Sequence, residues 1–246
     1  MYKHWANGVF YPPKLKQADW LGFYFEHFPT VEINASFYRL PGEPTVQSWA
    51  TKAPKGFIYA VKCWRWITHI RKLQQTSRPD VELFFQRIEP MWRNLGAVLV
   101  QLPPMMKADL PRLEAFWNTL PARLGNTKLR VALEVRHESW LTDSTRSLLD
   151  KLGGSLVLHD GRAATTQTND APFVYIRRHG TAANQGNYRE DEIRADAEMI
   201  RGFAKQGRDV YVYYNNDIGG HAVRNAKTLV QMVGASADPP SSRADH

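Results

Sequence analysis

Polar and charged side chains follow the apolar stretches of this sequence where strands are expected to end. The clearest stretch is residues 130–137, an apolar run that closes on Glu134, Arg136 and His137. A parallel strand covered on both faces is apolar nearly throughout, which this run fits. Alternate side chains of a strand share a face, so Glu134 and Arg136 stand together and can pair. The pair is either structural or part of a ligand site.

The other predicted strands end in the same way. Their polar residues are Glu32, Asn34, Lys62, Gln101, His159, Asp160, Arg177, Arg178, His179, Asn215, Asn216 and Asp217. In folds built from alternating strands and helices, the carboxyl ends of the strands meet on one side, and ligands bind there. A purely structural network would more readily be spread over both ends. The pattern therefore favours one functional site.

Several of these residues have the chemistry of catalysts. The candidate catalytic residues are Glu32, Glu134, His137, His159, Asp160 and His179. Glu32 and Glu134 can act as paired carboxylates, as in glycosidases, and the histidines can transfer protons. The alternative is that both carboxylates are charge partners of neighbouring cations. The separation that would decide between these interpretations does not follow from the sequence.

Basic and amide side chains at the same ends can hold a substrate. Lys62, Arg136 and Arg177 are the candidates for binding an anion, with Asn34 and Gln101 beside them. Arginine and lysine are the usual partners of carboxylates and phosphates. These residues predict an anionic substrate.

A second group of candidate binding residues lies at 215–221, where Asn215, Asn216 and Asp217 precede two glycines and His221. A glycine turn before a helix offers backbone N–H groups and the positive end of the helix dipole, which suits phosphate. The loops after the last strands of barrels often bind phosphate. The alternative is an ordinary entry into the last helix.

A basic and aromatic segment, residues 62–72, contains Trp64 and Trp66. Exposed tryptophans can stack on bases while cations hold phosphates, so a nucleic-acid partner is one interpretation. The other is a solvated loop with its tryptophans packed beneath it.

The candidate catalytic histidines could also bind a metal, but the sequence supports this interpretation less well. His137, His159, Asp160 and His179 have suitable ligand atoms for a divalent cation. However, no His-x-x-x-His spacing occurs, and the neighbouring cations would oppose a metal. We therefore predict no metal, and the sequence specifies no cofactor.

Seven strands alternating with helical stretches explain how these residues come together. We expect strands at residues 30–34, 57–62, 97–102, 130–137, 155–160, 173–177 and 210–214. Such alternation predicts a parallel sheet, and eight units closing into a barrel of the TIM type, (β/α)8, take roughly 250 residues. One strand is lacking. We expect a single domain over residues 1–235, and a disordered polar tail over residues 236–246.

Composition narrows the class of partner. The chain has 246 residues and a net charge of +8, which favours an anionic small molecule or nucleic acid. Its single cysteine, Cys63, excludes an internal disulfide and suits a reducing cytoplasm. No apolar run approaches the roughly 20 residues of a membrane span, so we expect no membrane partner. The oligomeric state does not follow from the sequence.

Motifs along nearly the whole chain resemble those of the DUF72 family, uncharacterised TIM-barrel proteins that include the bacterial YecE-like proteins. The matching segments are residues 2–5, 10–12, 31–38, 57–62, 99–104, 134–140, 175–180, 213–217 and 220–222. The resemblance implies the barrel fold and supplies no reaction. Members usually begin with a strand and a glycine turn ahead of the segment that matches Tyr2–Trp5. We expect that strand to lie upstream of this start.

Taken together, the residues predict a hydrolase-like enzyme acting on an anionic or phosphate-bearing substrate at the carboxyl ends of its strands. The alternatives are a protein that binds or processes nucleic acid, and a binder of a small anion without catalysis.

Overall fold

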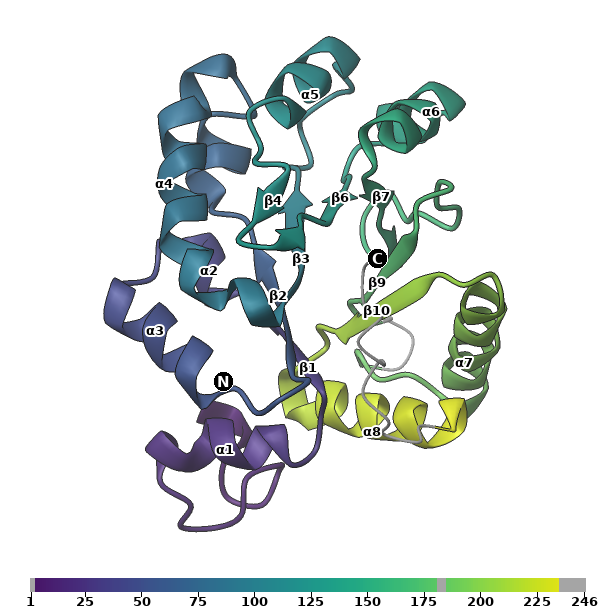
Figure 1. Ribbon diagram of the computed structural model, residues 1–246. Coiled ribbons are helices and arrows are strands. Elements are labelled where there is room, and N and C mark those ends of the chain that lie inside the picture. Colours follow the sequence, from purple (N-terminus) through teal and green to yellow (C-terminus); the bar gives the residue numbers. More distant parts are fainter. Residues whose placement is uncertain (1–2, 181–184, 235–246) are drawn as a thin grey trace.

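The computed structural model describes residues 3–180 and 185–234 and has an α/β fold of mostly parallel strands (Figure 1). Each of the seven predicted strands is present, and the fifth is divided in two. The strands of the parallel sheets are β1 (Thr30–Ile33), β2 (Ile58–Lys62), β3 (Leu95–Gln101), β6 (Val131–Glu134), β7 (Ser155–Leu156), β8 (Leu158–His159), β9 (Phe173–Arg178) and β10 (Asp209–Tyr214).

The parallel strands form two sheets that meet within the fifth predicted strand. One sheet has the order β1-β2-β3-β6-β7, and the other has the order β10-β9-β8. Only Val157 separates β7 from β8, and its N–H donates to the carbonyl of Leu133 in β6 at 2.9 Å. The strands therefore follow one another in chain order across both sheets. No backbone ladder joins β1 to β10 in the described part of the chain.

The helices that connect the strands lie on the outside of the sheets (Figure 1). They are α1 (Trp20–Phe25), α2 (Ala35–Tyr38), α3 (Glu43–Lys52), α4 (Arg78–Ile88), α5 (Leu110–Trp117), α6 (Asp143–Leu152), α7 (Glu190–Lys205) and α8 (His221–Val233). Gly153 and Gly234 end α6 and α8 in the left-handed conformation, which glycine adopts without a steric penalty.

Two local expectations are wrong, and one element was not expected. Residues 35–38 and 66–70 are helical, the latter as a π-turn, where loops were expected. An antiparallel hairpin, β4 (Arg123–Leu124) and β5 (Thr127–Lys128), interrupts the segment before β6. Segments this short carry too few residues for a hydrophobic period, so tertiary contacts decide their conformation.

Each sheet has one face against the helices and one inner face. Strand residues such as Val61, Val98 and Leu133 pack with the helices in the main apolar core. Their neighbours along the strands, such as Ala60, Leu99 and Ala132, form a separate inner cluster of strand residues and Val157. Both faces are therefore buried, which explains the apolar runs of the strands.

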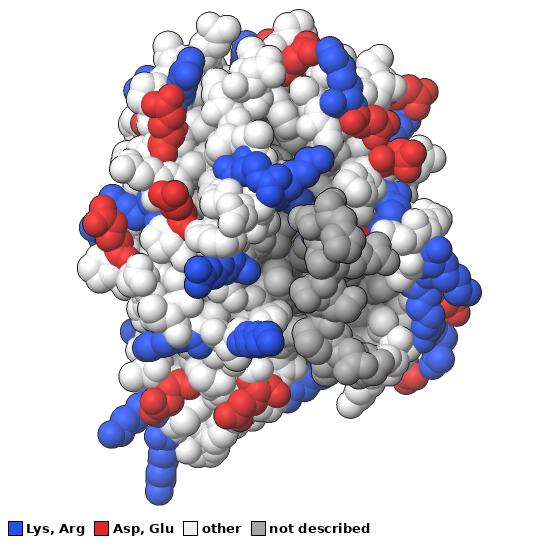
Figure 2. Space-filling view, in the orientation of Figure 1, with Lys and Arg blue, Asp and Glu red and all other residues white. Residues whose placement is uncertain are grey.

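The surface carries the positive charge that the composition predicts. Figure 2 shows Lys and Arg side chains over much of one face, several of them towards its middle. No helix within residues 3–180 and 185–234 is both long enough and apolar enough to cross a membrane. The expected tail, residues 236–246, lies outside the described residues.

Candidate functional site

The inner face becomes polar at the carboxyl ends of the strands. Gln101, the last residue of β3, lies beside Glu134, the last residue of β6, and His159 at the end of β8 lies beside Arg177. Paired residues of neighbouring strands project to the same side of a sheet. The alternation predicted from the sequence thus brings these polar side chains together above the apolar inner cluster.

Arg177 connects two carboxylates from distant parts of the chain. Its Nη1 donates to Glu134 Oε2 at 2.6 Å, and its Nη2 donates to Glu32 Oε1 at 2.7 Å. Its Nε donates to the other oxygen of Glu32 at 2.9 Å, and Asn215 Oδ1 accepts from Nη2 at 3.1 Å. Tyr175 also donates to Glu32, at 2.7 Å. Arg177 therefore holds Glu32 through both of its oxygens.

Both carboxylates are ionised in this arrangement. Burial raises the pKa of Glu134, but the charges of Arg177 and Arg136 outweigh burial and lower that pKa to about 2. Burial likewise opposes ionisation of Glu32, and Arg177 again holds its pKa below the usual value. A general acid needs a raised pKa. The geometry therefore favours the interpretation of Glu32 and Glu134 as charge partners.

Arg136 occupies the space between Glu134 and His179. Its Nη2 forms an ion pair with Glu134 Oε1 and lies 2.7 Å from Nε2 of His179. A guanidinium only donates, so Nε2 accepts and the imidazole is neutral. Burial lowers the pKa of His179 to about 4, in agreement with a neutral ring. A Cβ at Gly161 would lie 2.1 Å from Arg136 Nη1, so glycine leaves room for this guanidinium.

Among the described residues, Glu134, His159 and His179 are the only group of three whose ligand atoms lie close enough to hold one metal ion. Ligand atoms of Glu134, His159 and His179 lie within 4.8 Å of one another. However, the Arg136 guanidinium already contacts two of the three. Nε2 of His159 contacts the carbonyl of Val135 at 2.9 Å, and its Nδ1 accepts from the N–H of Gly161. The Arg136 cation beside Glu134 and His179, and the protein contacts of both His159 nitrogens, do not fit a bound cation.

Lys62 differs from the other charged groups of the site. Its side chain is 8% exposed, and its amine makes no hydrogen bond or ion pair with any described residue. Nζ lies 4.1 Å from the centre of the Phe37 ring. Burial and the charge of Arg177 lower the pKa of Lys62 to about 8. The hydroxyl of Ser36 donates to the carbonyl of Lys62 at 2.6 Å and fixes this strand end.

The other predicted residues lie around this cluster or outside it. Asn34 donates to Glu32 at 3.0 Å. Asp160 accepts from Tyr188 and from the N–H of His179. His137 accepts from the N–H of Ser139 and caps a short helical turn, so its ring makes a local structural contact.

The glycine turn before α8 is covered by other parts of the protein. Asp217 contacts His4 and Trp5, and a Cβ at Gly220 would lie 2.4 Å from Val9. Asn216 donates to Asn225 at 2.9 Å. His221 accepts from Arg224 at 3.0 Å. These contacts favour the ordinary entry into a helix over a phosphate site.

The tryptophan segment, residues 62–72, fits neither of its two interpretations fully, namely an exposed surface for nucleic acid and a loop with both tryptophans packed beneath it. Trp64 is half-buried against the main core, whereas Trp66 is 38% exposed and stacks on Trp64 with ring centres 6.1 Å apart. The Arg71 guanidinium covers the Trp66 ring at 5.5 Å. Part of the aromatic surface is therefore already in contact with protein.

Several residues of the site were not among the candidates. Tyr175 and Tyr188 hold Glu32 and Asp160, and Phe37 covers Lys62. Tyr175 lies two residues before Arg177, so strand alternation alone would have placed both on the inner face. Tyr188 and Phe37 lie in connecting segments, where no period indicates direction.

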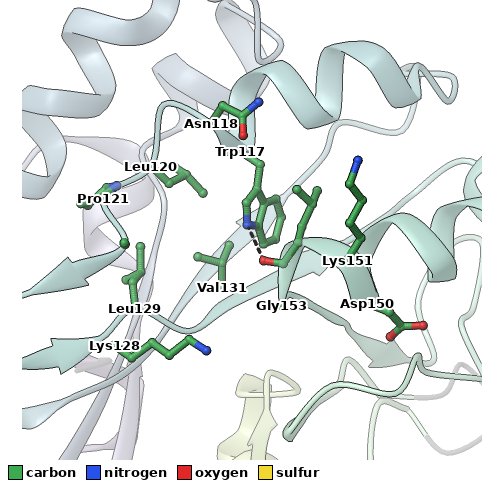
Figure 3. A pocket seen from close by; sticks show the side chains of 12 residues that line it. Trp117, Asn118, Leu120, Pro121, Lys128, Leu129, Val131, Asp150, Lys151 and Gly153 are labelled. Atoms are coloured by element: carbon green, nitrogen blue, oxygen red, sulfur yellow. Dashed lines mark hydrogen bonds between the residues drawn. The ribbon is translucent and has the colours of Figure 1, made fainter.

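A pocket of 580 Å³ lies away from this cluster (Figure 3). It is lined by the end of α5, the end of α6 and Val131, the first residue of β6. Glu134 is at the opposite end of that strand. Trp117 lies across the pocket and donates to the carbonyl of Leu152 at 3.1 Å. The pocket lining includes Lys128, Asp150 and Lys151, but it has no group of converging charges comparable to the polar cluster.

The sequence and the fold both match one family. The family model described as "Protein of unknown function DUF72" matches residues 1–245. This chain belongs to the DUF72 family. The resemblance seen in the sequence motifs is thereby confirmed.

A curated relative and a solved structure each match this DUF72 chain over most of its length. The UPF0759 protein YunF of Bacillus subtilis (strain 168) is 25% identical over 256 residues, which cover 91% of this chain and 89% of YunF. A crystal structure of a DUF72 protein from Thermotoga maritima covers 93% of this chain and 94% of its own, with 25% identity and a TM-score of 0.81.

A DUF72 protein from Enterococcus faecalis has a similar fold. Its crystal structure covers 88% of this chain and 88% of its own, with 20% identity and a TM-score of 0.77. The shared α/β architecture therefore extends over most of each chain.

Proposed function

We propose that the polar end of the inner face is the active site of an enzyme that acts on a small anionic substrate. The observation that carries the proposal is Lys62, which is largely buried beside the Arg177 network and whose amine makes no hydrogen bond or ion pair in the described part of the chain. A buried charged group that makes no direct hydrogen bond is costly, so such groups are retained where a ligand completes them.

The balance of charge around Lys62 supports an anion. The charged groups that act on it are Arg177, Arg136, Glu32 and Glu134. Lys62 and the two arginines contribute +3, and the carboxylates contribute −2, which leaves +1. Arg136 also has a buried Nε without a hydrogen-bond partner in the described residues. A carboxylate or phosphate bound at Lys62 would supply the hydrogen-bond acceptor that its amine lacks among the described residues.

Two finer elements belong to the same proposal. The parallel strands would enclose the site as a barrel of the (β/α)8 type, which is supported by their order and by their buried inner face. In a hydrolytic reaction, proton transfer would fall to His179. Its ring is neutral, and its side chain is 24% exposed, whereas Arg177 restrains both carboxylates.

The test measures the binding of inorganic phosphate and of phosphorylated sugars by isothermal titration calorimetry. We expect Lys62→Met to weaken binding at least tenfold, since a charge-assisted contact contributes about 1.5–3 kcal/mol. Lys55→Met is the matched control, because Lys55 is exposed and lies just before the other end of β2. Equal affinity of the wild type and Lys62→Met would contradict the proposal.

Salt dependence separates this proposal from nucleic-acid binding. The affinity of an oligonucleotide should fall by about one log unit per log of salt for each phosphate neutralised. A buried small-molecule site should respond less. Binding of oligonucleotides alone, abolished by salt, would replace the proposal with the nucleic-acid interpretation.

A further inference from the structure

The surroundings of Lys62 restrict what its amine can do. It lies at the end of β2, on the inner face, with the Phe37 ring 4.1 Å away and no acceptor in contact within the described residues. The cationic Arg177 acts on it from the same cluster. A lysine whose role was only to neutralise a neighbouring carboxylate would contact that carboxylate, as Arg177 contacts Glu32 and Glu134.

Burial and a neighbouring cation both favour the neutral amine. Against them, the Phe37 ring and the two carboxylates favour the charged form. Burial and Arg177 prevail, and the pKa of Lys62 falls to about 8. Desolvation and a nearby cation are the conditions that make a lysine nucleophilic in enzymes that form imines. At neutral pH both forms of this amine are populated.

We propose that Lys62 is a catalytic nucleophile that forms an imine with the carbonyl carbon of the anionic substrate. This inference rests on the proposed function and narrows its substrate class to compounds with an aldehyde or ketone next to a phosphate or carboxylate. The charged amine attracts the anion, and the neutral amine attacks the carbonyl.

The step balances without a further reactant. The nitrogen lone pair of Lys62 forms the C–N bond, and the carbonyl electron pair moves to oxygen, which takes the proton that the amine releases. The hydroxyl then leaves as water with one proton from solvent, and an iminium remains. Its single positive charge equals that of the ammonium, so Glu32 and Glu134 stabilise it as they stabilise the protonated lysine.

The test is reductive trapping of the whole protein with sodium borohydride. The phosphorylated probes are dihydroxyacetone phosphate and glyceraldehyde 3-phosphate, and the oxo-acid probes are pyruvate and 2-oxobutyrate. The reduced adducts are located by mass spectrometry after peptic digestion. At pH 7.5 the neutral fraction of an amine with a pKa near 8 exceeds that of a free lysine by on the order of 100-fold. We expect one adduct, on Lys62, at least tenfold more abundant than on exposed Lys55.

The probe that reacts identifies the anionic group of the substrate. Labelling of Lys62 that is no greater than that of Lys55, with every probe, would overturn the inference. The yield on Lys62 should also rise with pH and level off above about 8, as its amine becomes neutral. A yield that still rises in step with the exposed lysines above pH 9 would overturn it as well.

The variant Lys62→Arg distinguishes this inference from the proposed function. It keeps the charge and cannot form an imine, so phosphate binding should persist while the adduct disappears. Persistence of phosphate binding in the wild type without any adduct would overturn the imine and leave the anion site standing. The pH profile of trapping is measured on the wild-type protein alone. It therefore tests the imine even if the Lys62 variants fail to fold.

Discussion

At the scale of single residues, the stability of the site depends on one guanidinium that neutralises two buried carboxylates. Glu134 is fully buried, and it contacts Arg177 and Arg136. A buried ion pair adds little net stability relative to an apolar replacement, but removing one partner leaves the others uncompensated. The cluster is therefore intolerant of single changes.

Replacing Glu134 by Gln tests this coupling. We expect the free energy of unfolding to fall by about 3–5 kcal/mol, because two buried arginines lose a common counter-charge. Urea unfolding followed by circular dichroism measures it. Glu138→Gln is the control, because Glu138 is exposed in the same connection after β6. A loss no larger than that of the control would mean that the carboxylate is not needed to hold the arginines.

The depressed pKa of Lys62 predicts a pH dependence of stability. Between about 8 and 10.5 the folded protein has released this proton and the unfolded chain still binds it. Stability therefore rises with pH across this window, by at most about 3 kcal/mol. Below about pH 8 both states are protonated, so the cost of the buried charge is felt in full.

The measurement compares unfolding of the wild type and Lys62→Met at closely spaced pH values. Tyrosines titrate in the same range, and the difference between the two proteins removes their contribution. Parallel curves from pH 7 to 10.5 would show that Lys62 keeps an ordinary pKa in the folded state.

At the scale of elements, the strands can approach one another at their amino ends only because one residue is small. A Cβ at Gly96 in β3 would lie 2.4 Å from Ile58 Cγ2 and 2.8 Å from Tyr211 Cε1. The strand predicted at residues 97–102 begins earlier than expected, at Leu95, and so contains Gly96. A glycine between a helix and a strand signals a stop, and the close contact that requires it is visible only in three dimensions.

Gly96→Ala should destabilise the protein by about 1–3 kcal/mol, because the added methyl group overpacks the contact between β2, β3 and β10. Gly202→Ala is the control of opposite sign. Gly202 lies in α7 with nothing within 4 Å of an added Cβ, so alanine should stabilise by about 0.5–1 kcal/mol. Thermal unfolding of both variants measures the effect, and a neutral Gly96→Ala would refute the close contact.

At the scale of the whole molecule, side chains rather than a backbone ladder connect β1 to β10 in the described residues. The hydroxyls of Thr30 and Tyr213 lie 2.7 Å apart, and Asn34 donates to Asn215 at 3.4 Å. These contacts join the two sheets on the side opposite the β7–β8 connection. The inner face and its charged cluster depend on that junction, since Glu32 comes from β1 and Arg177 from β9.

Tyr213→Phe tests the junction. Loss of one buried hydrogen bond should cost about 0.5–1.5 kcal/mol of unfolding free energy. Tyr38→Phe serves as the control, since Tyr38 is 70% exposed and should be neutral. An unchanged stability of Tyr213→Phe in chemical unfolding would mean that the Thr30–Tyr213 contact does not hold the sheets together.

The sequence by itself determined the strands, their parallel arrangement and the polar character of one end of the inner face. Apolar runs of four to seven residues are local properties, and so is the alternation of side chains between the two faces of a strand. The sequence therefore shows both directly. Glu32, Lys62, Glu134 and Arg177 were all among the candidates for this reason.

Only the tertiary structure decided what those residues do. Arg177 contacts Glu32 across 145 positions of sequence, and the direction of each side chain there depends on strand register and on packing from both faces. In the folded protein His137 caps a short helical turn, and the amino-terminal segment covers the glycine turn before α8. The amine of Lys62 makes no hydrogen bond or ion pair among the described residues. Pairing of charges is a property of distances between strands, and no pattern within one strand contains it.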